Sequence, residues 1–390
     1  MIMELLNFLN EHENWEEILT NAPYYLIVKH DGPYVLLEYQ QFASDMANIL
    51  CQQARGSIFR QNYEGKWIAI SVGMFKFFNY GQIEAAEIDW ASAVVSTKVD
   101  GSNIRLAYDH IAGQWLLSTT GTIRANNVQL GSNRTFYSEF VRLIGGENKF
   151  AALCASLSKQ YTYYFEMVSY FNKIVVRYGE EAIYYIGCRD MITFNERPMA
   201  DMPAVMKEYG IRAIPTYFLS SIDECIAAAE ALGENNEGFV VTDTHFNRLK
   251  VKTPWYIAMH HMRGGGVLTV RRVIELWTTD LLDDFVGNFP EYQEFVQTVM
   301  DKVVDVIEKY DVAYNMAMKM CDGLSRKEAA QKINEIFTSR GAAYIFARMN
   351  GKVQNAAMYV FNNAKRSYRK FGDYIAAQLD TTEYGVEEEV

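Results

Sequence analysis

Short hydrophobic runs separated by polar turns fill the chain before residue 254, a pattern that predicts β-strands joined by tight connections. Residues 2–20 come first, and their leucines and aromatic residues recur at helical spacing, which predicts one amphipathic helix. Strands are predicted at 24–28, 34–39, 56–62, 66–72, 94–98, 103–108, 115–120, 162–168, 173–178, 182–188, 239–242 and 248–251, and helices at 135–144, 149–158, 204–209 and 222–232. This alternation predicts an α+β fold, with mixed antiparallel sheets and helices on their outer faces.

Beyond residue 254 the hydrophobic positions recur with the 3.6-residue period of helices. Helical segments are predicted at 270–282, 290–319, 326–339, 344–362 and 368–379. A chain of 390 residues is also long for one ordinary core. We therefore expect two domains, 1–253 and an all-α C-terminal domain at 254–390, with the glycine-rich residues 263–266 as a candidate hinge.

The charge of the chain argues against a surface that is basic all over. The formal net charge is -11, which does not favour wrapping by nucleic acid but leaves room for a local basic cleft. Between residues 325 and 371, ten lysines and arginines accompany two glutamates, and tyrosines 344, 359 and 368 lie among them. This basic strip could hold a phosphate backbone and stack bases, or it could be an ordinary solvated helix face.

Cysteine usage and hydropathy indicate the compartment. The five cysteines are scattered and form no CxxC pair, which suits a reducing environment and offers no zinc framework. The chain has no apolar run of membrane-spanning length and no basic signal-peptide start. We expect a cytoplasmic protein (in the host cytoplasm if viral) with no membrane partner, a monomer by default although the oligomeric state stays open, and a frayed tail at 380–390.

The candidate chemistry centres on Lys98, in the stretch Lys98-Val-Asp-Gly-Ser102 between two predicted strands. Asp-Gly is a favoured hairpin pair, so the stretch could be a plain turn. Alternatively, Lys98 is a nucleophile that takes a nucleotide onto its amine. Five further stretches lie in an order that suits nucleotidyl transfer: AlaArgGlySerIlePhe at 54–59, MetPheLysPhePheAsn at 74–79, TyrPheGluMetValSer at 164–169, GluGlyPheValVal at 237–241 and LeuLysValLysThrProTrpTyr at 249–256.

This ordered set resembles the covalent nucleotidyltransferase superfamily of ligases and capping enzymes. The ArgGly and LysPhePheAsn stretches ahead of the lysine are most similar to the RNA ligase 1 family, the phage-type RNA-repair ligases, over roughly residues 1–260. The resemblance implies an adenylyltransferase domain at 1–253 and an RNA-specificity role for 254–390. The helical second half favours this family, because the superfamily's DNA ligases and capping enzymes usually continue with a β-barrel.

The resemblance implies an ATP-dependent RNA ligase that uses Mg²⁺ or Mn²⁺. Lys98 would take AMP from ATP, AMP would pass to an RNA 5′-phosphate, and a 3′-hydroxyl would then seal the strand, as in the repair of a nicked tRNA. Three alternatives stay open: an mRNA-capping guanylyltransferase, a DNA ligase of the same superfamily, and a catalytically silent RNA-binding protein.

Individual roles combine local reasoning with the resemblance. Lys250 and Lys252 are two apart on a predicted strand, so both should point to one face, where they could favour a neutral Lys98 amine and hold the α-phosphate. The alternative is a polar strand face. The resemblance makes Glu237 the metal ligand, against a simple turn residue, and oxygen ligands suit magnesium. Glu166 is expected to accept a ribose hydroxyl, or else to form a structural salt bridge.

The remaining candidates follow from the resemblance. Arg55 and Lys76 would grip the β- and γ-phosphates of ATP, because an arginine fork fits two phosphate oxygens and a lysine supplies a point charge. The ATP-binding set also includes Val99 and, through its hydroxyl, Tyr39. Three further candidates are Thr120 and Gly121, near the ribose or the RNA end, and Arg189, for charge neutralisation. The adjacent histidines 260 and 261 are interpreted as capping or cleft residues, because neighbouring side chains diverge on a helix.

Overall fold

The computed structural model describes residues 2–379 except 41–42, 131–132, 173–175, 177, 234–235, 254–255, 257–267, 280 and 289–291. The candidate hinge at 263–266, the two histidines and the tail therefore lie outside the described residues. Contacts divide the chain into two compact units. Unit 1 comprises Met1–Trp15, Val28–Tyr39 and Met46–Met262, and unit 2 comprises Glu16–Ile27, Gln40–Asp45 and Arg263–Val390.

The predicted opening helix is wrong in one respect, because the structure has two helices, α1 (Glu4–Glu11) and α2 (Trp15–Thr20). His12 ends α1 with extended backbone angles, φ -122° and ψ 113°. The residues at the break, 12–14, are polar and bury no apolar face. An asparagine such as Asn14 also disfavours helix, because its side chain can hydrogen-bond nearby backbone groups in non-helical conformations.

A four-stranded sheet forms the first layer of unit 1. Its order is β1 (Ile27–Asp31), β2 (Tyr34–Glu38), β3 (Arg55–Gln61) and β4 (Trp67–Ser71), with α3 (Ile49–Gln53) leading into β3. The predicted hairpin is present as β1–β2, but its first strand runs from Ile27 to Asp31 and not over 24–28 as predicted, and Gly32 turns it at a φ of +59°. One face of this sheet is apolar and packs with Leu116, from β8 of the next sheet, and with Ile123, which follows that strand.

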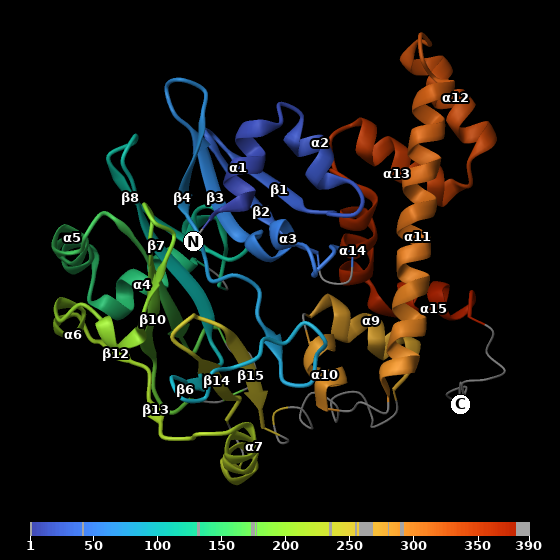
Figure 1. The fold of residues 1–390 in the computed structure, drawn as a ribbon. Helices are drawn as coiled ribbons and strands as arrows, with labels where there is room; N and C mark the ends of the chain where they lie inside the picture. The colour runs from blue at the N-terminus through green and yellow to red at the C-terminus, as the bar shows by residue number, and fades with distance from the viewer. Residues whose placement is uncertain are drawn as a thin grey trace. The chain divides into compact units, whose positions relative to one another are not determined.

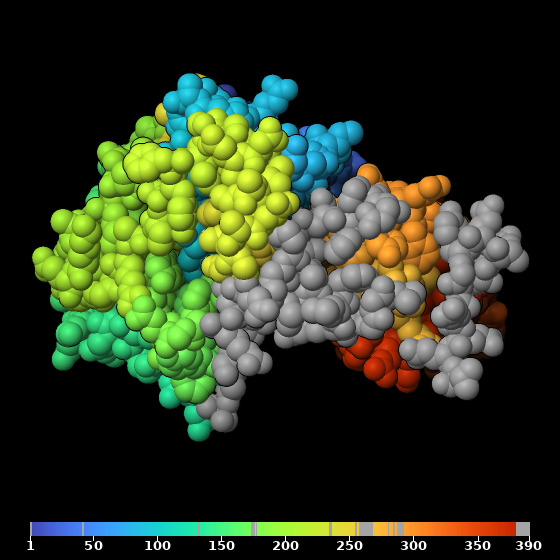
Figure 2. Space-filling view, turned by 90° about the horizontal axis from the view of Figure 1, so that it is seen from below, coloured from blue at the N-terminus to red at the C-terminus, as the bar shows by residue number. Residues whose placement is uncertain are grey.

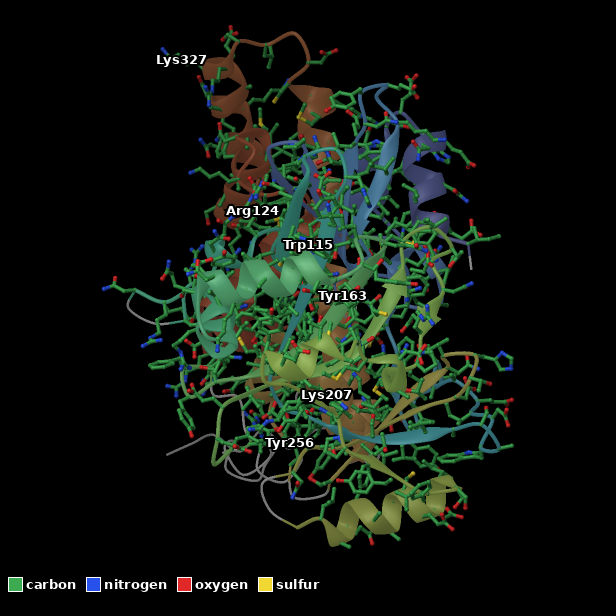
Figure 3. All side chains as sticks on the ribbon, turned by 90° about the vertical axis from the view of Figure 1, so that its left-hand side faces the viewer. Trp115, Arg124, Tyr163, Lys207, Tyr256 and Lys327 are labelled. Atoms are coloured by element: carbon green, nitrogen blue, oxygen red, sulfur yellow. The ribbon has the colours of Figure 1, made fainter. Side chains whose placement is uncertain are left out.

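The second sheet has six strands in the order β11-β10-β9-β7-β8, with β12 paired to β10. The strands are β7 (Ser102–Asp109), β8 (Gln114–Thr119), β9 (Tyr161–Val168), β10 (Ala182–Asp190), β11 (Glu196–Arg197) and β12 (Ile211–Ala213). Helices α4 (Phe136–Ile144), α5 (Glu147–Ser156) and α6 (Val205–Glu208) bury one face of it over a core that includes Ile104, Leu106, Tyr163 and Phe165, with the partly buried Trp115 packed against this core (Figures 1 and 3).

The third sheet has the order β13-β6-β14-β15-β5. Its strands are β5 (Phe78–Asn79), β6 (Val94–Lys98), β13 (Thr216–Tyr217), β14 (Gly238–Thr242) and β15 (Arg248–Lys252). Helix α7 (Ile222–Ala231), yellow-green in Figure 2, packs Cys225 and Ala229 against one face. The opposite face carries the polar side chains. The predicted α+β class is thus confirmed, with two short parallel pairs, β10–β12 and β15–β5.

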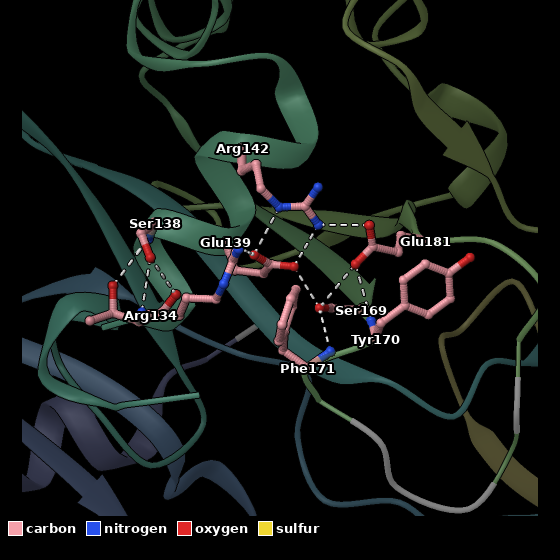
Figure 4. Close-up of polar contacts among 9 residues, drawn as sticks. Arg134, Ser138, Glu139, Arg142, Ser169, Tyr170, Phe171 and Glu181 are labelled. Atoms are coloured by element: carbon pink, nitrogen blue, oxygen red, sulfur yellow. Dashed lines mark hydrogen bonds and ion pairs between the residues drawn. The ribbon is translucent and has the colours of Figure 1, made fainter. Parts of the chain in front are cut away.

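A buried carboxylate anchors the loop after β9. Glu139, on α4, is fully buried and accepts hydrogen bonds from Arg134, Arg142 and Ser169 (Figure 4). Three donors lower the pKa of Glu139 against the desolvation that burial imposes. The network thereby holds Ser169, the residue directly after β9.

The helical C-terminal region is also confirmed. Unit 2 contains α9 (Val270–Thr278), α10 (Leu282–Asn288), α11 (Gln293–Met320), α12 (Arg326–Ile336), α13 (Ser339–Met349), α14 (Ala356–Arg366) and α15 (Tyr368–Ala376). Its core centres on Trp277 and also contains Tyr25, from the N-terminal part of the chain. Tyr344 is fully buried and donates a hydrogen bond to Asp311, so this tyrosine of the basic strip is not available to stack on nucleobases. Within the described residues, no helix combines the length and apolar character that crossing a membrane requires.

Asn355 ties the N-terminal part of unit 2 to its helices. Its side chain accepts the Met358 N–H at 2.6 Å, capping α14, and donates to the Leu26 carbonyl at 3.2 Å. We predict that Asn355→Ala lowers the free energy of unfolding by about 1–3 kcal/mol, because it removes a cap and leaves a buried carbonyl without its donor. Urea denaturation followed by circular dichroism measures this. Asn362→Ala, an exposed change in the same helix, is the control and should cost nothing; equal losses would contradict the assignment.

Candidate active site

The Lys98 stretch connects two different sheets. Lys98 is the last residue of β6 in the five-stranded sheet, and Ser102 is the first of β7 in the six-stranded sheet. Asp-Gly is therefore not a hairpin turn. A Cβ at Gly101 would lie 2.7 Å from the Met167 carbonyl oxygen and 3.1 Å from Cγ of Glu166. Glycine is thus required because the connection runs directly against β9, the strand that carries Glu166.

Strand register brings the charged residues of three motifs together. Gly238 on β14 lies opposite Lys98 on one side and Lys252 on the other. Glu237 precedes Gly238, and its Oε1 lies 2.6 Å from Nζ of Lys98 and 3.1 Å from Nζ of Lys252. The Glu237 and Lys252 side chains are each 4% exposed, whereas Lys98 is 21% exposed. One buried carboxylate oxygen is thus shared by two lysines, and the more accessible one is Lys98.

Gly238 makes this register possible. Its φ is +136°, and a Cβ there would lie 2.1 Å from the Val251 carbonyl oxygen. A side chain would therefore push β14 away from β15 and separate Glu237 from Lys252. The glycine of the GluGly motif is explained by close strand packing.

Side-chain alternation along β15 places its cations on the polar face of the sheet. Leu249 and Val251 enter the core beneath α7, so Lys250 and Lys252 point to the opposite face, as their spacing predicts. Burial on one face thus orients both lysines toward the Lys98 side of the sheet.

Glu166 approaches from the six-stranded sheet, where β9 pairs it with Asn103 of β7. Burial, together with the neighbouring carboxylates of Glu237 and Asp100, raises the pKa of Glu166 to about 8 against the opposing effect of Lys98. Glu166 therefore carries a proton at neutral pH, and it lies within electrostatic reach of Lys98. A protonated carboxyl can donate one hydrogen bond and accept others, which suits a sugar hydroxyl.

Asp100 and Tyr256 belong to the site but were absent from the predicted set. Asp100 is buried; its N–H donates to the Tyr178 hydroxyl at 2.7 Å, and its carboxylate accepts from the Val176 N–H at 2.8 Å. Tyr256 donates to the same carboxylate at 3.3 Å, and its ring lies 4.7 Å from Nζ of Lys252. Both residues occur in the stretches that carried the resemblance, but their contacts cross the chain and spacing does not reveal them.

A second cluster gathers the upstream cations on aromatic rings. The Phe77 ring lies 5.2 Å from the Arg55 guanidinium carbon and 5.2 Å from Nζ of Lys250. Nζ of Lys76 lies 5.0 Å from the Tyr39 ring centre. Strand β5 pairs with β15 so that Asn79 lies opposite Lys250, and this register brings Lys250 close to the Phe77 ring. Cation–π contacts help to hold these cationic side chains in place.

Thr120 and Gly121 lie beside this cluster, just after β8. Nζ of Lys29 donates to the Gly121 carbonyl oxygen and to Glu38, both at 2.8 Å. The loop is thereby tied to the β1–β2 hairpin that leads to Tyr39. Val99 directly follows Lys98, the last residue of β6, and its side chain is buried.

Arg189 lies in a buried ion-pair network. It is fully buried, its guanidinium is 2.7 Å from Glu196, and it donates to the Tyr164 hydroxyl at 3.1 Å. Arg248 binds the other oxygen of Glu196 at 2.5 Å. These contacts give Arg189 a structural role, and its part in charge neutralisation stays a prediction.

The arrangement suits binding of a polyanion next to an amine. Cations from several strands face one region, and the buried carboxylate of Glu237 lies among them. In the part of the chain that the structure describes, no group of three or more His, Cys, Asp or Glu side chains could hold a metal ion. Magnesium commonly uses one or two carboxylates together with substrate phosphates and water, and Glu237 fits that requirement.

Solved structures that match this chain share little sequence with it. The structure of an archaeal ATP-dependent RNA ligase (form 1) covers 98% of this chain and 99% of its own, with 14% identity and a TM-score of 0.46. That of Naegleria gruberi RNA ligase with PPi covers 61% of this chain and 94% of its own, with 10% identity and a TM-score of 0.35. Because both scores are below 0.5, neither carries an argument.

Sequence comparison is more specific. A protein of Autographa californica nuclear polyhedrosis virus, named as a bifunctional polynucleotide kinase/RNA ligase, is 26% identical over 289 residues. The match covers 70% of this chain and 40% of the viral protein, so the chain spans less than half of its relative's length. A family model of RNA ligases matches residues 53–256, a little more than half of the chain, and this segment contains Lys98, Glu166, Glu237 and Lys252. The chain therefore belongs to the RNA ligase family.

Proposed function

We propose that this protein is an ATP-dependent RNA ligase in which Lys98 is the nucleophile. The observation that carries the proposal is the convergence of Lys98, Glu237 and Lys252 through the register of three adjacent strands. A lysine amine at the accessible end of a cationic site is suited to attack an anionic phosphorus centre.

In the first step the Lys98 amine attacks the α-phosphorus of ATP. A P–N bond forms, the P–O bond to pyrophosphate breaks, and the amine loses its proton. The Lys98–Glu237 ion pair has to open for this attack, while Lys252 and Lys250 stabilise charge on the α-phosphate oxygens. A divalent cation such as Mg²⁺ or Mn²⁺, held by Glu237, would neutralise further charge on the phosphates.

The other candidate residues bind the rest of ATP. Arg55 and Lys76, with the Tyr39 hydroxyl, would grip the β- and γ-phosphates, because their side chains are already gathered on the Phe77 and Tyr39 rings. Glu166 would bind the ribose. Thr120 and Gly121 would lie near the sugar or the RNA end.

The later steps follow the family's reaction. AMP passes from Lys98 to an RNA 5′-phosphate, and a 3′-hydroxyl then displaces AMP to join the strands, with nicked tRNA as one candidate substrate. The viral relative's name combines kinase and ligase, and this chain corresponds to 40% of it. We also propose that residues 1–253 perform the adenylylation and that 254–390 contribute to the choice of RNA.

Replacing the nucleophile tests the proposal directly. Lys98→Ala and Lys98→Arg should each abolish the labelled enzyme band after incubation with α-labelled ATP and magnesium, because alanine has no amine and arginine stays protonated. Lys66→Ala, an exposed lysine on the β3–β4 hairpin, is the control and should label like the wild type. A persistent band in either Lys98 variant would rule out the nucleophile.

The same assay separates the alternatives. Labelling by GTP rather than ATP would indicate a capping guanylyltransferase. Joining of nicked DNA in preference to single-stranded 5′-phosphorylated RNA would indicate a DNA ligase. A protein that forms no lysyl-nucleotide at all would be an RNA-binding protein without ligase activity.

The raised pKa of Glu166 predicts a pH-dependent stability. Its native-state value of about 8 exceeds the ordinary value of 4.5, so between these limits the native state binds more protons and stability falls as pH rises. Glu166→Gln cannot ionise, and it should raise the melting temperature at pH 8.5 by about 2–4 °C relative to the wild type, with little difference at pH 5. The exposed change Glu64→Gln is the control. A pH-independent difference would contradict this account.

A further inference from the structure

Arg105 is a fully buried arginine without a carboxylate partner. It lies on β7 and is 1% exposed. Within the described part of the chain no Asp or Glu forms an ion pair with it, and its Nε has no hydrogen-bond acceptor. Arg189, another buried arginine of unit 1, is paired with Glu196, and the half-buried Arg60 is paired with Asp109. The carboxylate of Glu38 attracts Arg105 electrostatically but forms no ion pair with it among the described residues. A buried charge without an ion pair costs stability, so the position of Arg105 calls for a physical explanation.

The Arg105 guanidinium contacts the backbone that carries Arg55. Nη2 donates to the Thr119 carbonyl oxygen at 2.5 Å, and Nη1 makes a long contact of 3.5 Å with the carbonyl oxygen of Arg55. Arg105 thereby links the end of β8 to the start of β3. These two strands belong to different sheets, and residues at both ends are candidates for binding ATP.

Two glycines make room for the guanidinium. A Cβ at Gly56 would lie 2.8 Å from Nη2 of Arg105 and 2.1 Å from the Thr120 carbonyl oxygen, and one at Gly73 would lie 2.9 Å from Nη1. Gly56 also has a φ of +73°, which favours glycine. The glycine of the ArgGly motif is therefore required for two reasons: it adopts a positive φ, and it leaves space for the Arg105 guanidinium.

The charge of Arg105 also reaches the site. Desolvation, together with the nearby positive charge of Arg55, lowers the pKa of Arg105 to about 10 against the opposing effects of Tyr164 and Glu38, so the two cations interact. An arginine remains protonated at neutral pH even so. A buried cation behind Arg55 is screened little by water, and it makes the potential at the Arg55 side chain more positive. A triply or quadruply charged anion gains most from such a potential.

We propose that Arg105 is a positioning residue for the triphosphate: it fixes the Arg55 backbone and adds positive charge behind the Arg55 guanidinium. This inference rests on the proposed ligase function. It concerns only the step that uses ATP, because the joining of RNA that is already adenylylated involves no β- or γ-phosphate. The two steps should therefore respond differently to the loss of Arg105.

The test compares these two steps in Arg105→Met, which keeps the volume but removes the charge and the donors. The KM for ATP in lysyl-AMP formation should rise about ten- to a hundredfold, as expected for lost charge-assisted contacts. The rate of joining pre-adenylylated RNA should stay within about twofold of the wild type. Arg105→Lys keeps the charge but not the two-pronged guanidinium, so its KM for ATP should lie between those of the wild type and Arg105→Met. This variant also provides the test if Arg105→Met folds poorly.

Arg60→Met is the matched control, because Arg60 lies on β3 with Arg55 but is paired with Asp109. It should lower the melting temperature without changing the KM for ATP. An unchanged KM in the Arg105 variants, or a loss of both steps in parallel with the melting temperature, would overturn the positioning role alone. A wild-type protein inactive in both assays would instead overturn the proposed function, and this inference with it.

Discussion

The site depends on one carboxylate oxygen shared by two lysines. Glu237 reaches Lys98 and Lys252 because β14 lies between β6 and β15 with Gly238 in register with both lysines. Two ammonium groups and one carboxylate leave a local excess of positive charge, which the protein tolerates because the ion pairs offset part of the desolvation cost. That excess makes the site complementary to an anion, and only the absence of a Cβ at position 238 lets the strands come this close.

The junction of two sheets explains why the nucleophile and Glu166 meet. Lys98 ends a strand of the five-stranded sheet, whereas Glu166 lies on the six-stranded one. Residues 99–101 connect the sheets, and Asp100 holds this connection through Val176, Tyr178 and Tyr256. Helices cover one face of each of these two sheets, and Lys250 and Lys252 point to the opposite face of the five-stranded sheet. The stretch Lys98–Ser102 therefore connects two sheets, and this position places Lys98 close to Glu166.

Unit 2 is assembled from distant parts of the chain. Residues 16–27 and 40–45 belong to it together with the C-terminal helices, and Tyr25 contributes to its core. In the sequence, one of these segments lies before the hairpin β1–β2, which leads to Tyr39, and the other lies after it. A cut after residue 262 would therefore leave the two segments without the helices on which they pack. The activity of such a fragment would report on folding as much as on substrate choice.

The sequence by itself determined the element types, the helical second half and the set of charged motifs, because hydrophobic periodicity and short motifs are local properties. The same-face placement of Lys250 and Lys252 also followed from local alternation. Only the tertiary structure decided that Asp-Gly is no hairpin, that Arg189 shares Glu196 with Arg248, that Tyr344 is buried, and that Arg105 lies behind Arg55. Each of these depends on contacts between residues remote in sequence, and neither spacing nor residue type encodes which partners the fold brings within reach.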